Sequence, residues 1–207
     1  MQYDFTTIMD RRGKDAIAVD APAGNNTGND FFAGAKIREG FDLIPMWVAD
    51  MNFPALPAIP EAIIQRTKHP AYGYFDPSAA YYDGIINWQK TRNGVNDLTK
   101  ECIGYENGVL GGVVSALKVL CSNGDSVLLQ SPTYIGFTHC IEDNGWNIVL
   151  NPLVLDEEGI WRIDYEDMEE KIVQNKIHAA VFCSPHNPTG RVWAVSYTHL
   201  RAHETKA

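Results

Sequence analysis

The stretch from residue 107 to residue 190 most constrains the fold, because apolar runs of strand length alternate there with helical patterns. The predicted strands are residues 102–105, 126–130, 146–153 and 178–183, and the predicted helices are residues 111–120, residues 135–143 and a segment capped by Asp164. Strand–helix alternation at this spacing implies parallel pairing through right-handed crossovers. The predicted fold class is therefore α/β, with an incomplete, mostly parallel sheet and helices on both faces.

The composition is that of a globular protein, and its charge limits the partners. Of 207 residues, 45% are hydrophobic and 21% are charged. The formal net charge is -9, from 17 Lys and Arg against 26 Asp and Glu. An acidic chain without a basic block is a poor partner for nucleic acid or anionic membranes. We expect neither.

The cysteines and the amino terminus indicate the compartment. Cys102, Cys121, Cys140 and Cys183 are scattered without a CxxC pair, and residues 1–5 do not read as a secretory leader. No apolar run approaches the roughly 20 residues that a spanning helix needs. We expect reduced thiols in a cytoplasmic protein.

The part of the chain before residue 95 has less regular patterns. Residues 1–45 are predicted to be an irregular amino-terminal segment, followed by a short helix at 57–66 and an exposed aromatic loop at 72–77. Ser78 is a candidate cap for a helix that Gly94 ends. The face of that helix carries Tyr82, Ile85, Ile86 and Gln89.

Two turns are candidates for binding a flat, phosphorylated aromatic molecule. In Val109-Leu110-Gly111-Gly112 the backbone amides at a helix start form an anion cup, and tight packing is the simpler alternative. Neither a Gly-Lys-Ser/Thr ending nor a spaced GxGxxG is present, which excludes the usual nucleotide loops. Tyr134, after the next strand, can stack on a planar ring or can simply cover the sheet edge.

A third turn, Asn187-Pro188-Thr189-Gly190, follows the last predicted strand. It is a good β-turn sequence in its own right. In the functional interpretation the Asn187 amide donates to a phenolic oxygen of the bound ring. Loops at the carboxyl ends of parallel strands gather at one edge, so the three turns together predict one site.

These motifs resemble the fold-type I pyridoxal-phosphate enzymes, the class I/II aminotransferase superfamily. Within it the chain is similar to the cystathionine β-lyase, or C–S lyase, branch over about residues 1–193. The motifs that carry the likeness are Trp47-Val-Ala-Asp-Met-Asn-Phe53, Tyr72-Gly-Tyr74 and Ser184-Pro-His-Asn-Pro-Thr-Gly-Arg-Val-Trp193. Asn52 stands where an aspartate is usual in that branch.

The resemblance implies the cofactor pyridoxal 5'-phosphate and a role for each matching residue. The amides of Val109, Leu110 and Gly111 would hold the phosphate. Tyr134 would stack on the pyridine ring, and Asn187 would bind the O3′ atom of that ring. Two more implied contacts are Tyr74, reaching a partner's phosphate across a homodimer interface, and the Ala49 backbone, near the substrate carboxylate.

The implied activity is that of a C–S β-lyase. Such an enzyme cleaves cystathionine or a cysteine S-conjugate, a small amino-acid substrate, to a thiol, pyruvate and ammonia. An aminotransferase shares every motif present here and remains the alternative.

The same resemblance predicts that this chain is a truncated, non-catalytic fragment. The family's Schiff-base lysine lies after the Asn-Pro-Thr-Gly loop, where this chain has only Lys206, too near the loop. Lys118, Lys171 and Lys176 fit solvated helix positions, so no catalytic residue is assigned. The expected domains are the segment 1–45, a partial cofactor-binding domain 46–193 and a non-native tail 194–207. His199 and His203 in that tail lack an evident third ligand, so no metal is expected.

Overall fold

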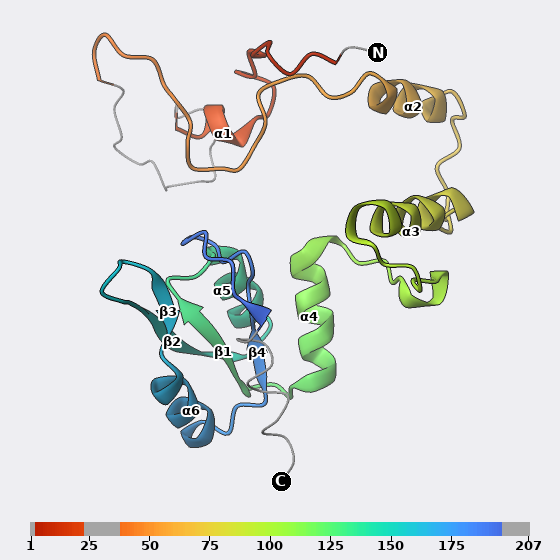
Figure 1. Ribbon diagram of the computed structural model, residues 1–207. Coiled ribbons are helices and arrows are strands. Elements are labelled where there is room, and N and C mark those ends of the chain that lie inside the picture. Colours follow the sequence, from red (N-terminus) through yellow and green to blue (C-terminus); the bar gives the residue numbers. More distant parts are fainter. Residues whose placement is uncertain (1–2, 23–37, 196–207) are drawn as a thin grey trace. The chain divides into compact units, whose positions relative to one another are not determined.

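The structure is a computed structural model that describes residues 3–22 and 38–195 (Figure 1). The chain divides into two compact units, Met1–Asp76 and Pro77–Ala207. This division groups residues 46–76 with the amino-terminal segment, whereas the sequence placed a boundary at residue 45. Of the predicted tail, only Ala194 and Val195 lie within the described residues.

The described part of the first unit contains two helices, α1 (Ile17–Asp20) and α2 (Ala58–Thr67). The predicted helix at 57–66 is thus confirmed, while the four-residue α1 interrupts a segment expected to be irregular. Residues 47–53 form an ion pair and a hydrogen bond with residues earlier in the chain. Arg11 forms an ion pair of 2.6 Å with Asp50, and the Trp47 indole donates to the Ala18 carbonyl at 3.1 Å. None of the helices within the described ranges is long and apolar enough to cross a membrane.

The second unit begins with α3 (Ala79–Asn93), which starts directly after Ser78 and ends directly before Gly94, as predicted. Gly94 ends the helix with φ +70°, a left-handed conformation that glycine adopts without a steric cost. Ser78 occupies the N-cap, but its side chain makes no capping hydrogen bond. The least exposed residues of α3 are those of the predicted face, Tyr82, Ile85, Ile86 and Gln89.

The predicted strand at 102–105 is wrong. A 3-10 helix, η2 (Lys100–Cys102), forms there instead, and residues 103–106 are irregular. The amides of Cys102 and Ile103 donate to the carbonyls of Thr99 and Lys100, both at 3.1 Å. These local bonds use the backbone groups that a strand would pair with a neighbour.

Four strands form the sheet in the order β3-β2-β1-β4. They are β1 (Ser126–Ser131), β2 (Asn147–Leu155), β3 (Trp161–Ile163) and β4 (Ala179–Val181). β1 pairs in parallel with β2 and β4, while β2 and β3 are antiparallel. A turn follows β2, with Gly159 at φ +74°. β3 beyond it was not predicted, because three residues carry too little periodicity.

Three helices cover the two faces of this sheet: α4 (Gly108–Leu120), α5 (Ile135–Glu142) and α6 (Tyr165–Gln174). Side chains alternate along a strand, so Val127 and Leu129 of β1 lie on one face, in a cluster with Leu117 of α4 and Ile141 of α5. On the other face the Gln130 amide reaches the Met168 sulfur of α6 at 3.9 Å. The predicted α/β fold class is confirmed.

Asp164 caps α6 as predicted. Its carboxylate accepts the Asp167 backbone N–H at 3.1 Å, which satisfies one of the free donors of the first turn. Met168 and Ile172 of this helix are both partly buried. The cap therefore places α6 with its apolar stripe against the sheet.

Candidate functional site

The starts of two helices and of one loop lie together at the carboxyl edge of the sheet. β1 and β4 run in parallel, with Leu129 opposite Val181, so both strands end at this edge. β1 leads into α5, and β4 leads into the loop that contains Asn187. α4 runs back to the start of β1, so its amino end lies at the same edge (Figure 1). Of the three predicted turns, those at Tyr134 and Asn187 therefore follow strands, whereas the turn at Val109 is the start of a helix.

The amino end of α4 carries the predicted anion cup. The helix begins at Gly108, three residues before the predicted start, so Val109, Leu110 and Gly111 form its first turn. The Gly108 N–H is used by the Glu106 carbonyl at 2.9 Å. In a helix that begins at Gly108, Gly111 supplies the first amide with an intrahelical acceptor. The amides of Val109 and Leu110 have none, and the Asn107 side chain does not cap them. They remain as donors for an anion.

Gly136, in the first turn of α5, brings Leu110 and Tyr134 together. A Cβ added at Gly136 would lie 2.3 Å from Cε1 of Tyr134 and 3.0 Å from Cδ1 of Leu110. The missing side chain of this glycine is therefore what admits the Tyr134 ring. The ring also meets Phe137 edge-on, at 5.5 Å between centroids. At 40% exposed, Tyr134 keeps part of its surface open, which suits stacking better than covering the core.

Glu106 is a feature of this edge that the sequence did not predict. Its carboxylate Oε2 lies 3.9 Å from the position of a Cβ on Gly111, and its Cγ lies 3.8 Å from that on Gly112. A carboxylate at a helix amino terminus interacts favourably with the helix dipole. Its negative charge would repel an anion bound at the same helix start. An acid two residues before a helix-opening glycine was the available signal.

The loop after β4 is folded on itself. The His186 N–H donates to the Arg191 carbonyl and the Gly190 N–H to the His186 carbonyl, both at 2.7 Å. The His186 Nδ1 lies 2.9 Å from the Thr189 hydroxyl. The predicted turn is thus confirmed, with Gly190 at φ +72°, and Asn187 is exposed on it.

His186 is the buried centre of that loop, and sequence reasoning did not single it out. Its ring packs edge-on to Trp193, at 5.9 Å between centroids, and the residue is only 3% exposed. Loss of hydration lowers the pKa of the His186 imidazole, because burial disfavours its charged form. A neutral imidazole therefore braces the turn that presents Asn187.

The two remaining predicted site residues lie in the other unit. Tyr74 and Ala49 belong to Met1–Asp76, and both are exposed. Tyr74 stands in the predicted aromatic loop, whose other rings, Tyr72 and Phe75, are exposed as well. Their predicted contacts with cofactor and substrate stay predictions.

The lysines considered in the sequence lie away from the carboxyl edge. Lys118 is exposed in the last turn of α4, and Lys176 precedes β4, both at the opposite end of these elements. Lys171 of α6 holds the Asp167 carboxylate at 2.8 Å. No lysine of α4, α5 or the loop after β4 lies at this edge within the described residues of the second unit.

Comparison with known proteins identifies the family. The aminotransferase class I and II family matches residues 43–197. Cystathionine beta-lyase PatB of Bacillus subtilis (strain 168) is 39% identical over 153 residues, which are 74% of this chain and 39% of that protein. Glutamate-pyruvate aminotransferase AlaA of Escherichia coli (strain K12) is 31% identical over 131 residues, 62% of this chain and 31% of that protein.

The fold likeness agrees with these matches. The PLP-bound C-S lyase from Staphylococcus hominis superimposes with a TM-score of 0.75 at 30% identity, covering 95% of this chain and 46% of that one. The chain therefore spans less than half the length of these proteins. With the predicted superfamily confirmed by both sequence and structure, the chain belongs to the aminotransferase class I and II family.

Proposed function

We propose that this chain supplies cofactor-binding elements of a pyridoxal 5'-phosphate-dependent carbon–sulfur β-lyase. The reaction would cleave cystathionine or another cysteine S-conjugate to a thiol, pyruvate and ammonia. The names of PatB and of the Staphylococcus hominis enzyme support this reaction class. When bound, the cofactor supplies an electron sink for the negative charge that develops at the substrate Cα.

The observation that carries the proposal is the convergence of Leu110 and Tyr134 on Gly136. It sets an aromatic ring beside the first turn of α4, where the amides of Val109 and Leu110 have no intrahelical acceptor and can bind an anion. A phosphate group and a flat ring in one molecule match this pair of features. The residues present therefore fit the phosphorylated pyridine cofactor.

Each residue at the edge then has a defined task. The first-turn amides of α4 would bind the phosphate, with the helix dipole adding to the attraction. Tyr134 would stack on the pyridine face and exclude water from it. Asn187, presented by the turn around His186, would donate its side-chain amide to O3′ of the ring.

The other unit would complete the site in an assembly. Tyr74 would reach the phosphate of a partner subunit in a homodimer, and the Ala49 backbone would lie near the substrate carboxylate. The substrate is a small amino acid. We place the protein in the cytoplasm, in keeping with its free cysteines, and its acidity argues against nucleic acid or membrane partners.

The described residues support binding better than turnover. A lyase needs an amine or another base at the substrate Cα proton, and the carboxyl edge of the described unit presents no lysine. We therefore expect the 207-residue chain to bind the cofactor without turning over cystathionine.

An aminotransferase is the second candidate, because AlaA matches over much of the same region. The two activities differ in their need for an acceptor. Incubation of the protein with cystathionine and cofactor, with and without an added keto acid, distinguishes a lyase from an aminotransferase. Pyruvate without added keto acid supports the lyase, and a strict keto-acid requirement supports the aminotransferase. Either activity in this chain would contradict the expected absence of turnover.

Binding is tested with pyridoxamine 5'-phosphate, whose amine cannot condense with surface lysines. We expect saturable binding, followed by calorimetry, and much weaker binding of pyridoxamine without the phosphate. Tyr134→Ala should weaken binding roughly fivefold, since stacking contributes about 1 kcal/mol. Tyr81→Ala is the matched control, because Tyr81 in α3 is also 40% exposed. Equal effects of the two variants would contradict the proposed site.

A further inference from the structure

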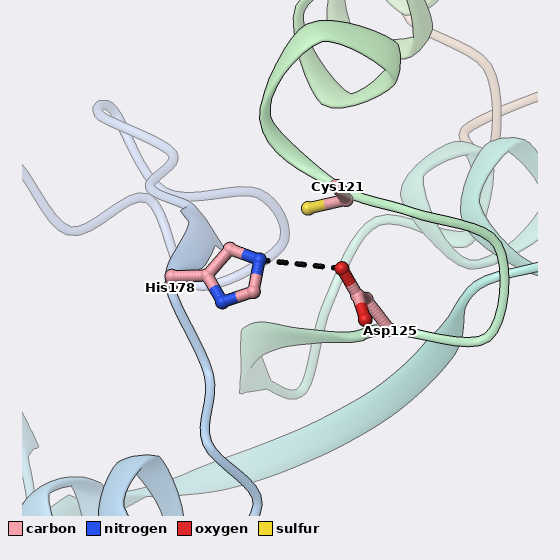
Figure 2. Close-up of side chains that lie close together, drawn as sticks. All are labelled: Cys121, Asp125 and His178. Carbon is pink, nitrogen blue, oxygen red and sulfur yellow. Dashed lines mark ion pairs between the residues drawn. The ribbon is translucent and has the colours of Figure 1, made fainter.

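Three potential metal ligands meet at the amino edge of the sheet, at the other end of the strands from the proposed cofactor site. Cys121 follows the last turn of α4, Asp125 immediately precedes β1, and His178 immediately precedes β4. One ligand atom from each residue lies within 4.8 Å of the other two. Figure 2 shows the thiol, the carboxylate and the imidazole pointing toward a common space.

We propose that Cys121, Asp125 and His178 bind a zinc ion. Thiolate, imidazole and carboxylate are the three side-chain groups that zinc takes in proteins, and a water would complete a tetrahedral site. Mg²⁺ and Ca²⁺ prefer oxygen ligands alone, so this set does not suit them. The proposal is independent of the cofactor site.

The spacing is close to what zinc requires. Bonds of about 2.0–2.3 Å in tetrahedral geometry set neighbouring ligand atoms roughly 3.3–3.6 Å apart. His178 Nε2 and Asp125 Oδ2 are 3.3 Å apart, which already matches that span. The Cys121 sulfur lies within 4.8 Å of a ligand atom of each of the other two residues, so it would have to move closer on binding.

Backbone hydrogen bonds hold two of the ligands in place. The Asp125 Oδ2 accepts the Ser122 N–H at 2.7 Å, and the Asp125 N–H returns to the Ser122 carbonyl at 3.1 Å. The Cys121 N–H donates to the Leu117 carbonyl at 2.7 Å, as the end of α4. The turn between them is fastened to the loop before β2, because the Gly124 N–H donates to the Gly145 carbonyl at 2.8 Å.

The imidazole is oriented for coordination. His178 Nδ1 lies 3.2 Å from the Lys176 carbonyl. A carbonyl oxygen only accepts, so Nδ1 carries a hydrogen. Nε2 faces the Asp125 carboxylate and would give up its own hydrogen on binding the metal. A backbone acceptor on the second nitrogen is the usual support of a metal-binding histidine.

An ion pair between His178 and Asp125 is the simpler explanation of their contact. The two side chains are 57% and 32% exposed, and exposed pairs contribute little to stability. That explanation gives no role to Cys121. The thiol, a soft ligand, is what distinguishes a zinc site from a surface pair.

A bound ion would join the end of α4 and the start of β1 to the start of β4. His178 is far in sequence from Cys121 and Asp125, so the ion would add a long-range link beside the first pair of the β1–β4 ladder, Val127 and Ala179. Because zinc would bind the folded chain and not the unfolded one, its addition should raise the unfolding temperature.

Cobalt is the probe for the site, because a Co²⁺ ion in a zinc site reports its ligands by absorption. The full 207-residue chain, reduced and free of metal, is titrated with Co²⁺. We expect a sulfur-to-cobalt charge-transfer band and the strong visible bands of a tetrahedral ion, both removed by Zn²⁺. Cys121→Ser should abolish the charge-transfer band. His178→Gln should weaken binding by at least about 10-fold.

Matched variants separate this site from other thiols and histidines. Cys140→Ser changes another partly buried cysteine, and His199→Gln with His203→Gln removes both histidines of the carboxyl-terminal tail. All of these should leave the spectrum intact. Circular dichroism checks that Cys121→Ser and His178→Gln still fold, and both variants should lose the zinc-dependent rise in unfolding temperature. Absence of the charge-transfer band in the parent, or its loss in Cys140→Ser, would overturn the proposal.

Discussion

The side-chain amide of Asn151 donates a 2.8 Å hydrogen bond to the carboxylate of Asp167, and this bond joins β2 to α6. The same amide donates to the Asp164 carbonyl at 3.0 Å. Asn151 is fully buried, and Lys171 holds the Asp167 carboxylate from the other side at 2.8 Å. The hydrogen bonds from Lys171 and Asn151 lower the pKa of Asp167, because both donors favour its charged form.

Asn151→Ala should therefore destabilise the fold by about 1–3 kcal/mol, because it removes the two hydrogen bonds donated by a fully buried amide. The measurement is urea unfolding, in which the midpoint should fall while the slope stays the same. Asn175→Ala is the matched control. Asn175 also donates to a carbonyl, that of Lys171, but it is exposed, so the change should stay within about 0.5 kcal/mol. A midpoint unchanged by Asn151→Ala would contradict this account.

Gly136→Ala should displace the Tyr134 ring while leaving the fold largely intact. The added methyl group would overlap the ring, but the ring is 40% exposed and can turn away. We expect pyridoxamine 5'-phosphate affinity to fall about as far as in Tyr134→Ala. Gly84→Ala in α3 is the control, since its Cβ would meet nothing within 4 Å. That change should keep the affinity and add up to about 1 kcal/mol of stability, from helix propensity.

Glu106→Gln should strengthen binding of a phosphorylated ligand. The change removes a negative charge from the amino end of α4, where the phosphate is proposed to bind. Calorimetric titration with pyridoxamine 5'-phosphate at low ionic strength measures the effect, and added salt should reduce it. Glu166→Gln is the control, because Glu166 lies in the first turn of a different helix, α6. Weaker binding by Glu106→Gln would argue against this position of the phosphate.

His186 should make stability depend on pH below its usual pKa of about 6.5. Burial lowers the pKa of the folded imidazole, so in acid the unfolded chain binds a proton that the folded chain does not. Stability should therefore fall as the pH drops from 6.5 toward the folded-state pKa, and be fully present above 6.5. His186→Gln should flatten that part of a plot of urea midpoint against pH. His139→Gln, an exposed position in α5, should leave the slope as it is.

Much of the fold followed from local sequence signals. The helix ending before Gly145, the cap at Asp164 and the glycine stop at Gly94 were all predicted, and each depends on groups close together in the chain. The same holds for β1, whose continuous apolar run indicates a strand buried on both faces. Family membership also followed from motifs alone.

The failures share a cause. The strand predicted at 102–105 became η2, and β3 was overlooked, because the state of a short segment depends on which distant backbone pairs with it. Periodicity over three or four residues carries no information about such partners. The early start of α4 moved Val109 and Leu110 from a loop into a helical turn for the same reason.

The sequence by itself determined the fold class and the family, and it predicted the residues of a site. Only the tertiary structure decided that Gly136 seats Leu110 beside Tyr134, that His186 is the buried centre of its loop, and that Cys121, Asp125 and His178 meet at the opposite edge. The reason is physical. Capping and periodicity act between neighbours along the chain, whereas these juxtapositions come from the parallel pairing of β1 with β4 and the packing of α4 against α5.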